Sequence, residues 1–564
     1  MITRNIKNYI LAGSMCCGML AVTSSCSDFL DILPTNDVVL ENFWTETADV
    51  TSVMNSCYET MAHSDALMRM FVWGELRSEN IIAGSNVPNE INEILKENLL
   101  PTNPYCNWAK FYEAINRCNI VCYYAPKVQA IDPNYSEEEM KANVAEAVTL
   151  RSLAYFYLIR AFRDVPYTKE PSIDDTQEYQ LPATPFADVV DSLIVDLENI
   201  KEDAVRRYYV DESSNAYVNS SRITRWAVYA LLADLYLWKG DWNNAISYCD
   251  QVIDFKRKQY EEQLEREGII SDIDLVDSIP IILEKPVGST LCGHAYDEIF
   301  GRGNSFESIF ELYFDGSGQS NSLVSSYYMN NNNTLGRLCA PDFLLKDVAA
   351  GQNSIFKRTD GRAYESGEFV SSRYAITKYA RTSVSYSTQN VSSEKDLKLV
   401  KSPSSGTRAN WIFYRLSDMI LIKAEALIER NQPGDLDLAF SLIDLVNRRA
   451  NDAITGRSST LKKTDYVDSQ AAMEQLVLEE RQREFLFEGK RWFDLVRFAR
   501  RDGKNTRLVD LCTRKLLENV NAAKIKLSDP NIIYFPYAKN ELKVNPKLHQ
   551  NSAFSSGEDT EVKR

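Results

Sequence analysis

The sequence predicts a mainly α protein in which a scaffold of helix pairs carries a large irregular portion. Two observations favour this fold class. Apolar residues recur at helical spacing in pairs of segments joined by short breaks, whereas one long stretch, 256–409, is rich in Gly, Ser, Asn and Tyr. The chain has 564 residues, which is enough for a sizeable core in one large or two ordinary domains.

The clearest helix pair covers 226–253. Its first helix places apolar residues on one face, Gly240 and Asp241 interrupt the pattern, and the same period resumes over 245–253. Alanines on the first helix are small enough for two helices to approach closely. Such a hairpin resembles a tetratricopeptide unit, so we expect a tetratricopeptide-like scaffold.

A second pair has the same design at 416–446, with Pro433 and Gly434 at its break. It lies far from the first pair in the sequence, so the units have no fixed period. Helical spacing of apolar residues predicts further helices at 108–124, 143–163, 186–200, 473–487 and 491–500.

The irregular stretch 256–409 contains the run Asn330–Asn333 and a Ser-rich stretch at 383–393. A long irregular segment in a compact chain is usually functional or disordered. Scattered aromatic residues favour an ordered surface that makes contacts. They include Tyr296, Phe314, Tyr327, Tyr328, Tyr374 and Tyr379.

The first 25 residues have the features of an export signal. Two basic residues precede a mostly apolar stretch, 10–22, which is too short to span a bilayer, and small residues then lead to Cys26. A cysteine in this position resembles a bacterial lipobox, in which the thiol is lipidated and becomes the first residue of the mature chain. We expect a signal peptide at 1–25 and a lipid anchor with its tether at 26–40. An ordinary cleaved signal and a buried core helix are the alternatives.

The formal net charge of −16 argues against a nucleic-acid partner, since the phosphate backbone binds basic surfaces. It also argues against adhesion to anionic lipid head groups, so we expect membrane contact through the anchor only. No stretch after Cys26 is long and apolar enough to cross a bilayer.

The sequence contains few residues that could bind a metal ion or a cofactor. The chain has three histidines, and its eight cysteines after Cys26 are scattered. Cys118 and Cys122 share a helix face, where zinc or a disulfide is one interpretation and buried free thiols are another. We predict no metal ligand and no cofactor.

The segment 480–497 concentrates charged residues. Glu480, Glu484 and Glu488 recur at a spacing of four, which predicts three carboxylates on one helix face, and Gly489 is expected to end that helix. A glycosidase would use two such carboxylates as acid and base. Arginines lie within a turn of each acid, so we favour an ion-pair network that fixes how two helices meet. These arginines are Arg481, Arg483 and Arg491.

Common catalytic signatures are absent from the sequence. It has no Gly-x-Gly-x-x-Gly, no P-loop, no Gly-x-Ser-x-Gly and no His-Glu-x-x-His motif. No catalytic residue is therefore predicted, and a binding protein is favoured over an enzyme.

The stretch from Glu480 reads Glu-Arg-Gln-Arg-Glu-Phe-Leu-Phe-Glu-Gly-Lys-Arg-Trp-Phe-Asp-Leu-Val-Arg and resembles the signature of the SusD/RagB family, the surface nutrient-binding lipoproteins of Bacteroidetes. The resemblance extends over nearly the whole mature chain, because further motifs follow in the family's order. They are Cys26-Ser-Asp-Phe-Leu-Asp with Pro34, Phe43-Trp44 with Tyr58, Gly74-Glu-Leu-Arg-Ser-Glu-Asn80, Tyr414-Arg-Leu-Ser-Asp418 with Lys423-Ala-Glu-Ala426, and the closing residues Pro536, Glu541, Asn545-Pro546 and Gln550-Asn551.

The resemblance implies a SusD-like fold, with a helical scaffold and an irregular portion that faces a ligand. Its parts would be an N-terminal helical part at 41–255 and a C-terminal part at 256–564. The latter would comprise the irregular segment 256–409, a helical segment at 410–500 and a closing segment at 501–564.

The resemblance also implies a lipid-anchored protein on the outer face of the outer membrane, over a SusC-like TonB-dependent transporter. Such a protein is not catalytic; it binds an oligosaccharide or polysaccharide and delivers it to the transporter. Capture of peptides or glycoprotein fragments, as in RagB-like members, is the alternative.

Two regions are expected to contact a glycan, namely the loop after the 74–80 motif and the irregular segment. Sugar rings stack on aromatic side chains, and their hydroxyls suit Asn, Asp, Gln and Arg. The expected contacts are Asn86, Asn92, Tyr296, Phe314, Tyr327 and Tyr328. Ordinary packing of each tyrosine between loop and core is the alternative. Four tryptophans at helix positions are expected in the core, Trp108, Trp226, Trp242 and Trp492.

Overall fold

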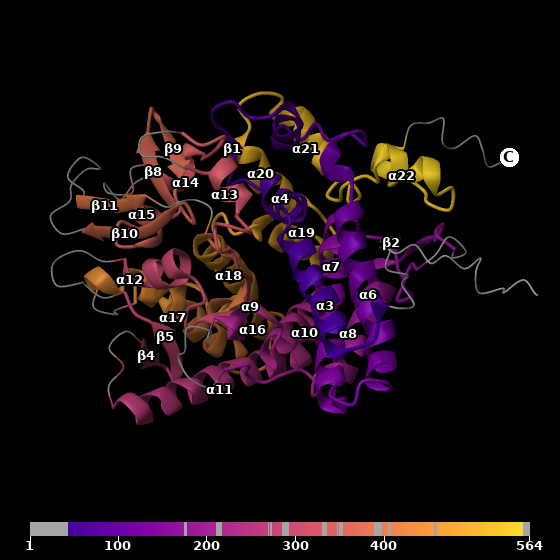
Figure 1. Ribbon diagram of the computed structural model, residues 1–564. Coiled ribbons are helices and arrows are strands. Elements are labelled where there is room, and N and C mark those ends of the chain that lie inside the picture. Colours follow the sequence, from indigo (N-terminus) through magenta and orange to yellow (C-terminus); the bar gives the residue numbers. More distant parts are fainter. Residues whose placement is uncertain are drawn as a thin grey trace, which may run out of the picture.

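A computed structural model describes residues 43–173, 178–209, 217–268, 270, 273–284, 293–329, 335–346, 348, 354–387, 398–403, 408–455 and 459–555. The prediction of a mainly α protein is confirmed, because helices dominate these residues and the strands form small sheets (Figure 1). The expected signal peptide, Cys26 and the whole expected tether lie outside the described residues. No helix among the described residues has the length and apolar character needed to cross a membrane.

Nine long helices pack in succession. In order of contact they are α3 (Thr47–Ala62), α6 (Ala109–Gln129), α7 (Glu137–Phe162), α8 (Phe186–Ile200), α10 (Arg225–Lys239), α11 (Trp242–Glu267), α16 (Leu416–Arg430), α17 (Asp435–Thr455) and α18 (Gln470–Glu484). The two expected helix pairs are α10 with α11 and α16 with α17. Because α11 packs directly on α16, pairs that are distant in the sequence form one continuous stack (Figure 1).

The break in the first helix pair has the expected physical cause. Gly240 ends α10 with a φ of +84°, a left-handed conformation that glycine adopts without a steric penalty. Asp241 then caps α11, since its side chain accepts a hydrogen bond from the Asn244 N–H at 3.2 Å. Ala230 and Ala233 are fully buried, as close helix packing requires.

The segment expected to be irregular begins later than expected, because α11 continues to Glu267, and it contains strands. A four-stranded antiparallel sheet has the order β1 (Ile82–Ala83), β7 (Leu338–Ala340), β9 (Arg373–Ile376) and β8 (Gly367–Val370). The other strands pair two by two: β2 (Val165–Pro166) with β3 (Ala183–Thr184), β4 (Ile273–Val276) with β5 (Ile279–Ile282), β6 (Ser308–Leu312) with β12 (Trp411–Arg415), and β10 (Arg381–Ser387) with β11 (Lys398–Pro403). Most of these strands lie to one side of the helical stack (Figure 1).

Two hairpin turns explain why these strands were hard to predict. The β4–β5 turn is formed by Asp277 and Ser278, and the β8–β9 turn by Ser371 and Ser372, all with positive φ. Two successive left-handed residues are typical of a type I′ turn, which usually carries Asn-Gly or Asp-Gly. Neither turn has that dipeptide, so the sequence lacks the usual hairpin signal.

Shorter helices complete the fold. They are α4 (Ser64–Phe71), η2 (Val72–Leu76), α5 (Asn89–Leu95), α9 (Val218–Ser221), α12 (His294–Tyr296), η4 (Asp297–Arg302), α13 (Ser322–Tyr327), α14 (Asp342–Leu345), α15 (Arg362–Ser366), α19 (Arg491–Asp502), α20 (Thr506–Cys512), α21 (Val520–Leu527) and α22 (Lys539–Val544), with 3₁₀ turns η3 (Pro104–Cys106), η6 (Lys463–Asp465), η7 (Thr513–Lys515) and η8 (Ser552–Phe554). One large apolar core runs through the helical stack and the strands together. Cys118 is a buried free thiol and Cys122 a half-buried one.

Candidate functional site

Glu484, at the end of α18, is the centre of a buried ion-pair network. Its carboxylate lies 2.9 Å from the guanidinium of Arg362 and 2.5 Å from that of Arg415, and it also pairs with Arg449. Burial raises the pKa of Glu484, but the charges of Arg449, Arg415 and Arg362 outweigh burial and hold this pKa well below its usual value. The group is therefore a permanent anion among three cations.

Glu488 extends the network beyond the helix end. It pairs with Lys378 at 2.7 Å and with Arg415 at 2.9 Å. Burial opposes ionisation of Glu488, but the charges of Arg415 and Lys378 lower its pKa to about 2. Arg415 thus joins two carboxylates, and through β12 it ties the strands to the helical stack.

The expected ion-pair network is confirmed, with two corrections. Helix α18 ends at Glu484, so Glu488 lies beyond it rather than on the same helix face. Of the three arginines expected as partners, Arg483 pairs with Glu480, at 2.9 Å. The other two pair elsewhere, Arg481 with Asp494 and Arg491 with Glu79. Local spacing identified the acids, but most of their partners come from distant segments.

The motif at 74–80 packs against this same segment. Glu79 pairs with Arg491 at 2.6 Å across 412 positions of the sequence. A Cβ on Gly74 would lie 1.9 Å from the carbonyl oxygen of Gly489, so the two backbones meet at a distance that only glycine permits. The motifs that carry the family resemblance therefore form a buried seam of the scaffold.

The carboxylates of this seam are unsuited to acid–base catalysis. A glycosidase acid needs a raised pKa and contact with the substrate. Glu480, Glu484 and Glu488 are at most 2% exposed, and their pKa values are lowered, because neighbouring cations outweigh the effect of burial. In the described chain, no group of three or more His, Cys, Asp or Glu side chains is placed to hold a metal ion.

The four aromatic residues expected to contact a ligand lie inside the molecule. The exposed fractions are 1% for Tyr296, 2% for Phe314, 8% for Tyr327 and 0% for Tyr328. The Tyr328 hydroxyl donates a hydrogen bond to the Phe487 carbonyl oxygen at 2.7 Å. In this conformation these rings pack the core, and Phe314 also lines the second of the hollows described below, so their contact with a sugar stays a prediction. The alternative of ordinary packing fits them.

Asn86 and Asn92 lie near β1, away from those aromatic residues in the sequence. Asn86 is exposed in the loop between β1 and α5, with a φ of +53°, and Asn92 is half-buried in α5. Neither residue lines the hollows described next. Their contact with a ligand stays a prediction.

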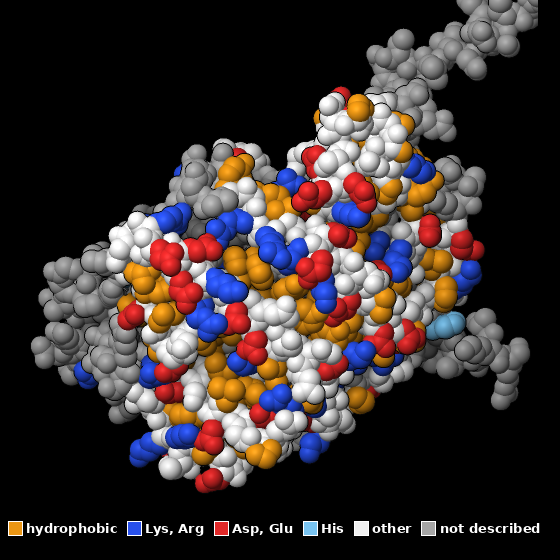
Figure 2. Space-filling model, turned by 90° about the horizontal axis from the view of Figure 1, so that it is seen from below, with side chains coloured by type: hydrophobic (Ala, Val, Ile, Leu, Met, Phe, Trp, Pro, Cys, Tyr) orange, Lys and Arg blue, Asp and Glu red, His pale blue; other side chains and the backbone are white. Residues whose placement is uncertain are grey.

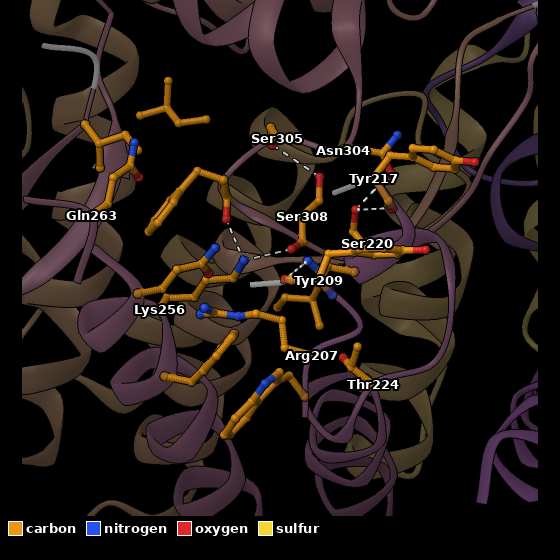
Figure 3. A pocket seen from close by; sticks show the side chains of 18 of the residues that line it. Arg207, Tyr209, Tyr217, Ser220, Thr224, Lys256, Gln263, Asn304, Ser305 and Ser308 are labelled. Atoms are coloured by element: carbon orange, nitrogen blue, oxygen red, sulfur yellow. Dashed lines mark hydrogen bonds between the residues drawn. The ribbon is translucent and has the colours of Figure 1, made fainter. Parts of the chain in front are cut away.

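A hollow of about 450 Å³ lies between α11, α9 and the turn that precedes β6 (Figure 3). Trp226 and Phe255 line it as a stacked pair, with ring centroids 3.9 Å apart and planes 11° apart. Trp226 is half-buried, so its indole forms part of a hollow as well as of the core. Polar residues around it include Tyr209, Tyr217, Asn219, Gln259, Gln263 and Asn304.

A second hollow, of about 680 Å³, adjoins the first and shares Arg302 with it. Tyr217 of the first hollow stacks on Tyr313 of the second, with ring centroids 4.7 Å apart and planes 29° apart. Tyr217 is 37% exposed and Tyr313 is 40% exposed. We call these two hollows, with Tyr217, Tyr313 and Arg302 where they meet, the tyrosine cleft.

Backbone geometry explains why these rings reach solvent. Tyr313 and Phe314 follow β6, and neighbouring residues of an extended chain point to opposite sides. Phe314 is therefore buried while Tyr313 faces outward. Another ring of the cleft, Tyr209, is fixed beside α9 by the Asn219 side chain. This side chain accepts a hydrogen bond from the Tyr209 N–H at 3.1 Å and donates one to the Tyr209 carbonyl oxygen at 2.8 Å.

Lys256 fixes the turn that precedes β6. Its Nζ donates hydrogen bonds to the carbonyl oxygens of Phe306 at 2.5 Å and Ser308 at 2.9 Å (Figure 3). Burial lowers the pKa of Lys256 to about 7, and burial likewise raises the pKa of nearby Glu311 to about 7. These hydrogen bonds hold the turn in place, and with it Asn304, which lines the cleft.

Comparisons with known proteins match the chain along most of its length. A family model described as the SusD family matches residues 307–554, and one described as "Starch-binding associating with outer membrane" matches residues 28–237. A SusD-like protein of Formosa agariphila is 26% identical over 94% of this chain and 96% of its own.

Solved structures share the fold. A SusD superfamily protein of Bacteroides thetaiotaomicron has a TM-score of 0.64 at 19% identity, over 91% of this chain and 99% of its own. A SusD homolog from the same organism has a TM-score of 0.63 at 21% identity, over 91% of this chain and 100% of its own. At such identities the likeness establishes the fold.

Proposed function

Because the chain belongs to the SusD family, we propose that it binds a nutrient oligosaccharide or polysaccharide at the cell surface and delivers it to a SusC-like TonB-dependent transporter. The protein supplies binding and leaves the glycan chemically unchanged. Lipidated Cys26, behind a signal peptide at 1–25, holds it on the outer face of the outer membrane.

The stacked pair of exposed tyrosines in the tyrosine cleft is the observation that carries this proposal. Sugar rings have apolar C–H faces that stack on aromatic rings, and hydroxyls that hydrogen-bond to amides and guanidinium groups. The hollows, of about 450 and 680 Å³, have the size of ordinary ligand sites. The description of the N-terminal family model supports a glycan as the ligand.

Isothermal titration of the purified mature protein against a polysaccharide panel tests the ligand class. We expect binding of at least one glycan, and weaker binding of that glycan by Tyr217→Ala and Tyr313→Ala. Tyr123→Ala is the matched control, because Tyr123 is 42% exposed on α6 and lies outside the cleft. Binding of peptides without binding of any glycan would replace this proposal by the RagB-like alternative.

Two further experiments test the location and the partner. Mass spectrometry of the mature N-terminus should find an acylated Cys26, and Cys26→Ala should release the protein from the membrane fraction. A large transporter should co-purify with the lipoprotein after gentle detergent extraction. An unacylated N-terminus on a free protein would contradict the proposed anchor, and recovery as a lone monomer would contradict the partnership.

A further inference from the structure

The tyrosine cleft is basic, although the whole chain has a net charge of −16. On the face shown in Figure 2, acidic and basic side chains are interspersed, whereas cations outnumber anions among the charged residues that line the cleft. The permanent cations are Arg206, Arg207, Arg266, Arg302, Arg381 and Arg408, and the anions are Glu262, Glu298 and Asp315. At physiological ionic strength charges beyond about 8 Å are screened. The charges that line the cleft therefore act on a bound ligand more strongly than the net charge of the whole chain does.

The three anions of the cleft already have partners. Glu262 pairs with Arg207 at 3.4 Å, and Glu298 with Arg302 at 2.6 Å. Asp315 accepts hydrogen bonds from the backbone N–H groups of its own loop, at 2.8, 2.9 and 3.1 Å. Two of the three carboxylates are therefore paired with arginines of the cleft, and Asp315 keeps its charge.

Several cations, by contrast, lack a counter-ion. Within the described ranges, no carboxylate lies at ion-pair distance from Arg206, Arg266 or Arg408. Arg381 is 1% exposed and lies 3.6 Å from the carboxylate of Glu368, but its Nε and Nη1 are buried without a hydrogen-bond acceptor. A buried guanidinium with unused donors is costly unless an anionic or polar group meets it.

We propose that the tyrosine cleft selects an anionic glycan, whose sugars carry carboxylate or sulfate groups. This inference rests on the proposed function and specifies its ligand class. Guanidinium groups bind carboxylate and sulfate oxygens through paired, charge-assisted hydrogen bonds. Tyr217 and Tyr313 hold a sugar ring by stacking, and Arg302 meets the acidic substituent from its place in both hollows. The Arg302 side chain is 75% exposed, so its guanidinium is accessible.

Titration with matched polysaccharide pairs tests this selection. One pair is polygalacturonate and its carboxyl-reduced form, and the other is a sulfated galactan and its desulfated form. We expect the anionic member of one pair to bind at least about tenfold more tightly than its neutral counterpart, the gain of one good charge-assisted contact. The pair that shows the difference identifies carboxylate or sulfate as the group recognised. Raising NaCl from 50 to 300 mM should weaken binding of the anionic member alone.

Arginine variants assign the effect to the cleft. Arg302→Gln and Arg408→Gln should each weaken binding of the anionic glycan about three- to tenfold and so reduce its preference over the neutral form. Arg257→Gln is the matched control, since Arg257 is an arginine of α11 that pairs with Asp254 outside the cleft. Equal affinity for both members of each pair, with no salt dependence, would overturn the inference and leave glycan binding intact. Absence of binding to every glycan would contradict the proposed function as well.

Discussion

The buried seam around Glu484 and the tyrosine cleft use the same kinds of side chain in opposite ways. In the seam, Glu484 and Glu488 are surrounded by cations and are at most 2% exposed. In the cleft, guanidinium groups outnumber carboxylates, and Arg302 keeps a side chain that is 75% exposed. Satisfied charges fix the position of backbone segments, whereas unsatisfied charges and open rings remain available to a ligand.

The contrast also separates the motifs that carry the family resemblance from the residues proposed to bind the ligand. The 74–80 motif and the 480–497 segment meet in the seam, where Gly74 faces Gly489 and Glu79 pairs with Arg491. The matched motifs therefore hold the helical stack together. The cleft draws on the segments around α9, α11 and β6, to which the sequence assigned no motif.

The largest effect is expected from removing the central charge of the seam. Glu484→Gln leaves three buried guanidinium groups short of one anion, which should lower the free energy of unfolding by about 3–5 kcal/mol. Urea unfolding measures this loss. Glu479→Gln is the control on the same helix, because Glu479 is 45% exposed and lies 3.9 Å from Arg483. Its effect should stay within about 0.5 kcal/mol; equal losses would remove the distinction between seam and surface.

The next largest effect is expected in the pH dependence of the free energy of unfolding, to which the seam contributes through Glu488. The folded-state pKa of Glu488 is about 2, below its ordinary value of 4.5, so its stabilisation is complete above pH 4.5 and is lost as the pH falls toward 2. That difference corresponds to about 3 kcal/mol. Glu488→Gln should flatten the fall in unfolding free energy between pH 4.5 and pH 2, as urea unfolding at several pH values would show.

Glu311, beside the cleft, provides the control of opposite sign. Burial raises its pKa to about 7, so its contribution to stability is present below pH 4.5 and is lost as the pH rises through 7. Glu311→Gln should therefore flatten the alkaline side of the stability profile and leave the acid side steep. Identical profiles for the Glu488 and Glu311 variants would contradict these two assignments.

A smaller effect is expected from the rings of the cleft. Tyr217→Ala or Tyr313→Ala removes one face of the stack, which should cost about 0.5–1.5 kcal/mol of binding, or about two- to tenfold in Kd. The free energy of unfolding should change little, because both rings are more than a third exposed. Titration with the best glycan of the panel measures the first quantity and urea unfolding the second. Loss of stability with unchanged affinity would make the pair structural.

The smallest effect is expected from the loop beside β1. If the tyrosine cleft is the binding site, Asn92→Ala should change the affinity for the glycan by less than about twofold, because Asn92 lies outside both hollows. Titration checks this, and Asn86→Ala extends it to the exposed end of the loop. A loss as large as that of Tyr313→Ala would move the ligand site from the cleft to this loop.

The sequence predicted the helical stack well because periodicity and capping are local. Gly240 and Asp241 marked the break between α10 and α11, and the two expected helix pairs exist. It did not predict the β4–β5 and β8–β9 hairpins, whose turns lack a glycine. The partners of Glu484 also escaped prediction, because Arg362 and Arg449 are neighbours only after folding.

The residues proposed to face the ligand were harder to predict from the sequence than the helices. In one case the expected residue and the exposed one are direct neighbours. Phe314 was expected to face a ligand, but it is 2% exposed, whereas the neighbouring Tyr313 is 40% exposed. Tyr217 could not be identified, since its stacking on Tyr313 joins segments 96 positions apart.

A crystal structure of the protein with a bound oligosaccharide tests the central claim most directly. We expect a sugar ring against Tyr217 and Tyr313, with an acidic substituent within hydrogen-bond distance of Arg302. A sugar bound elsewhere, with the tyrosine cleft empty, would contradict the account.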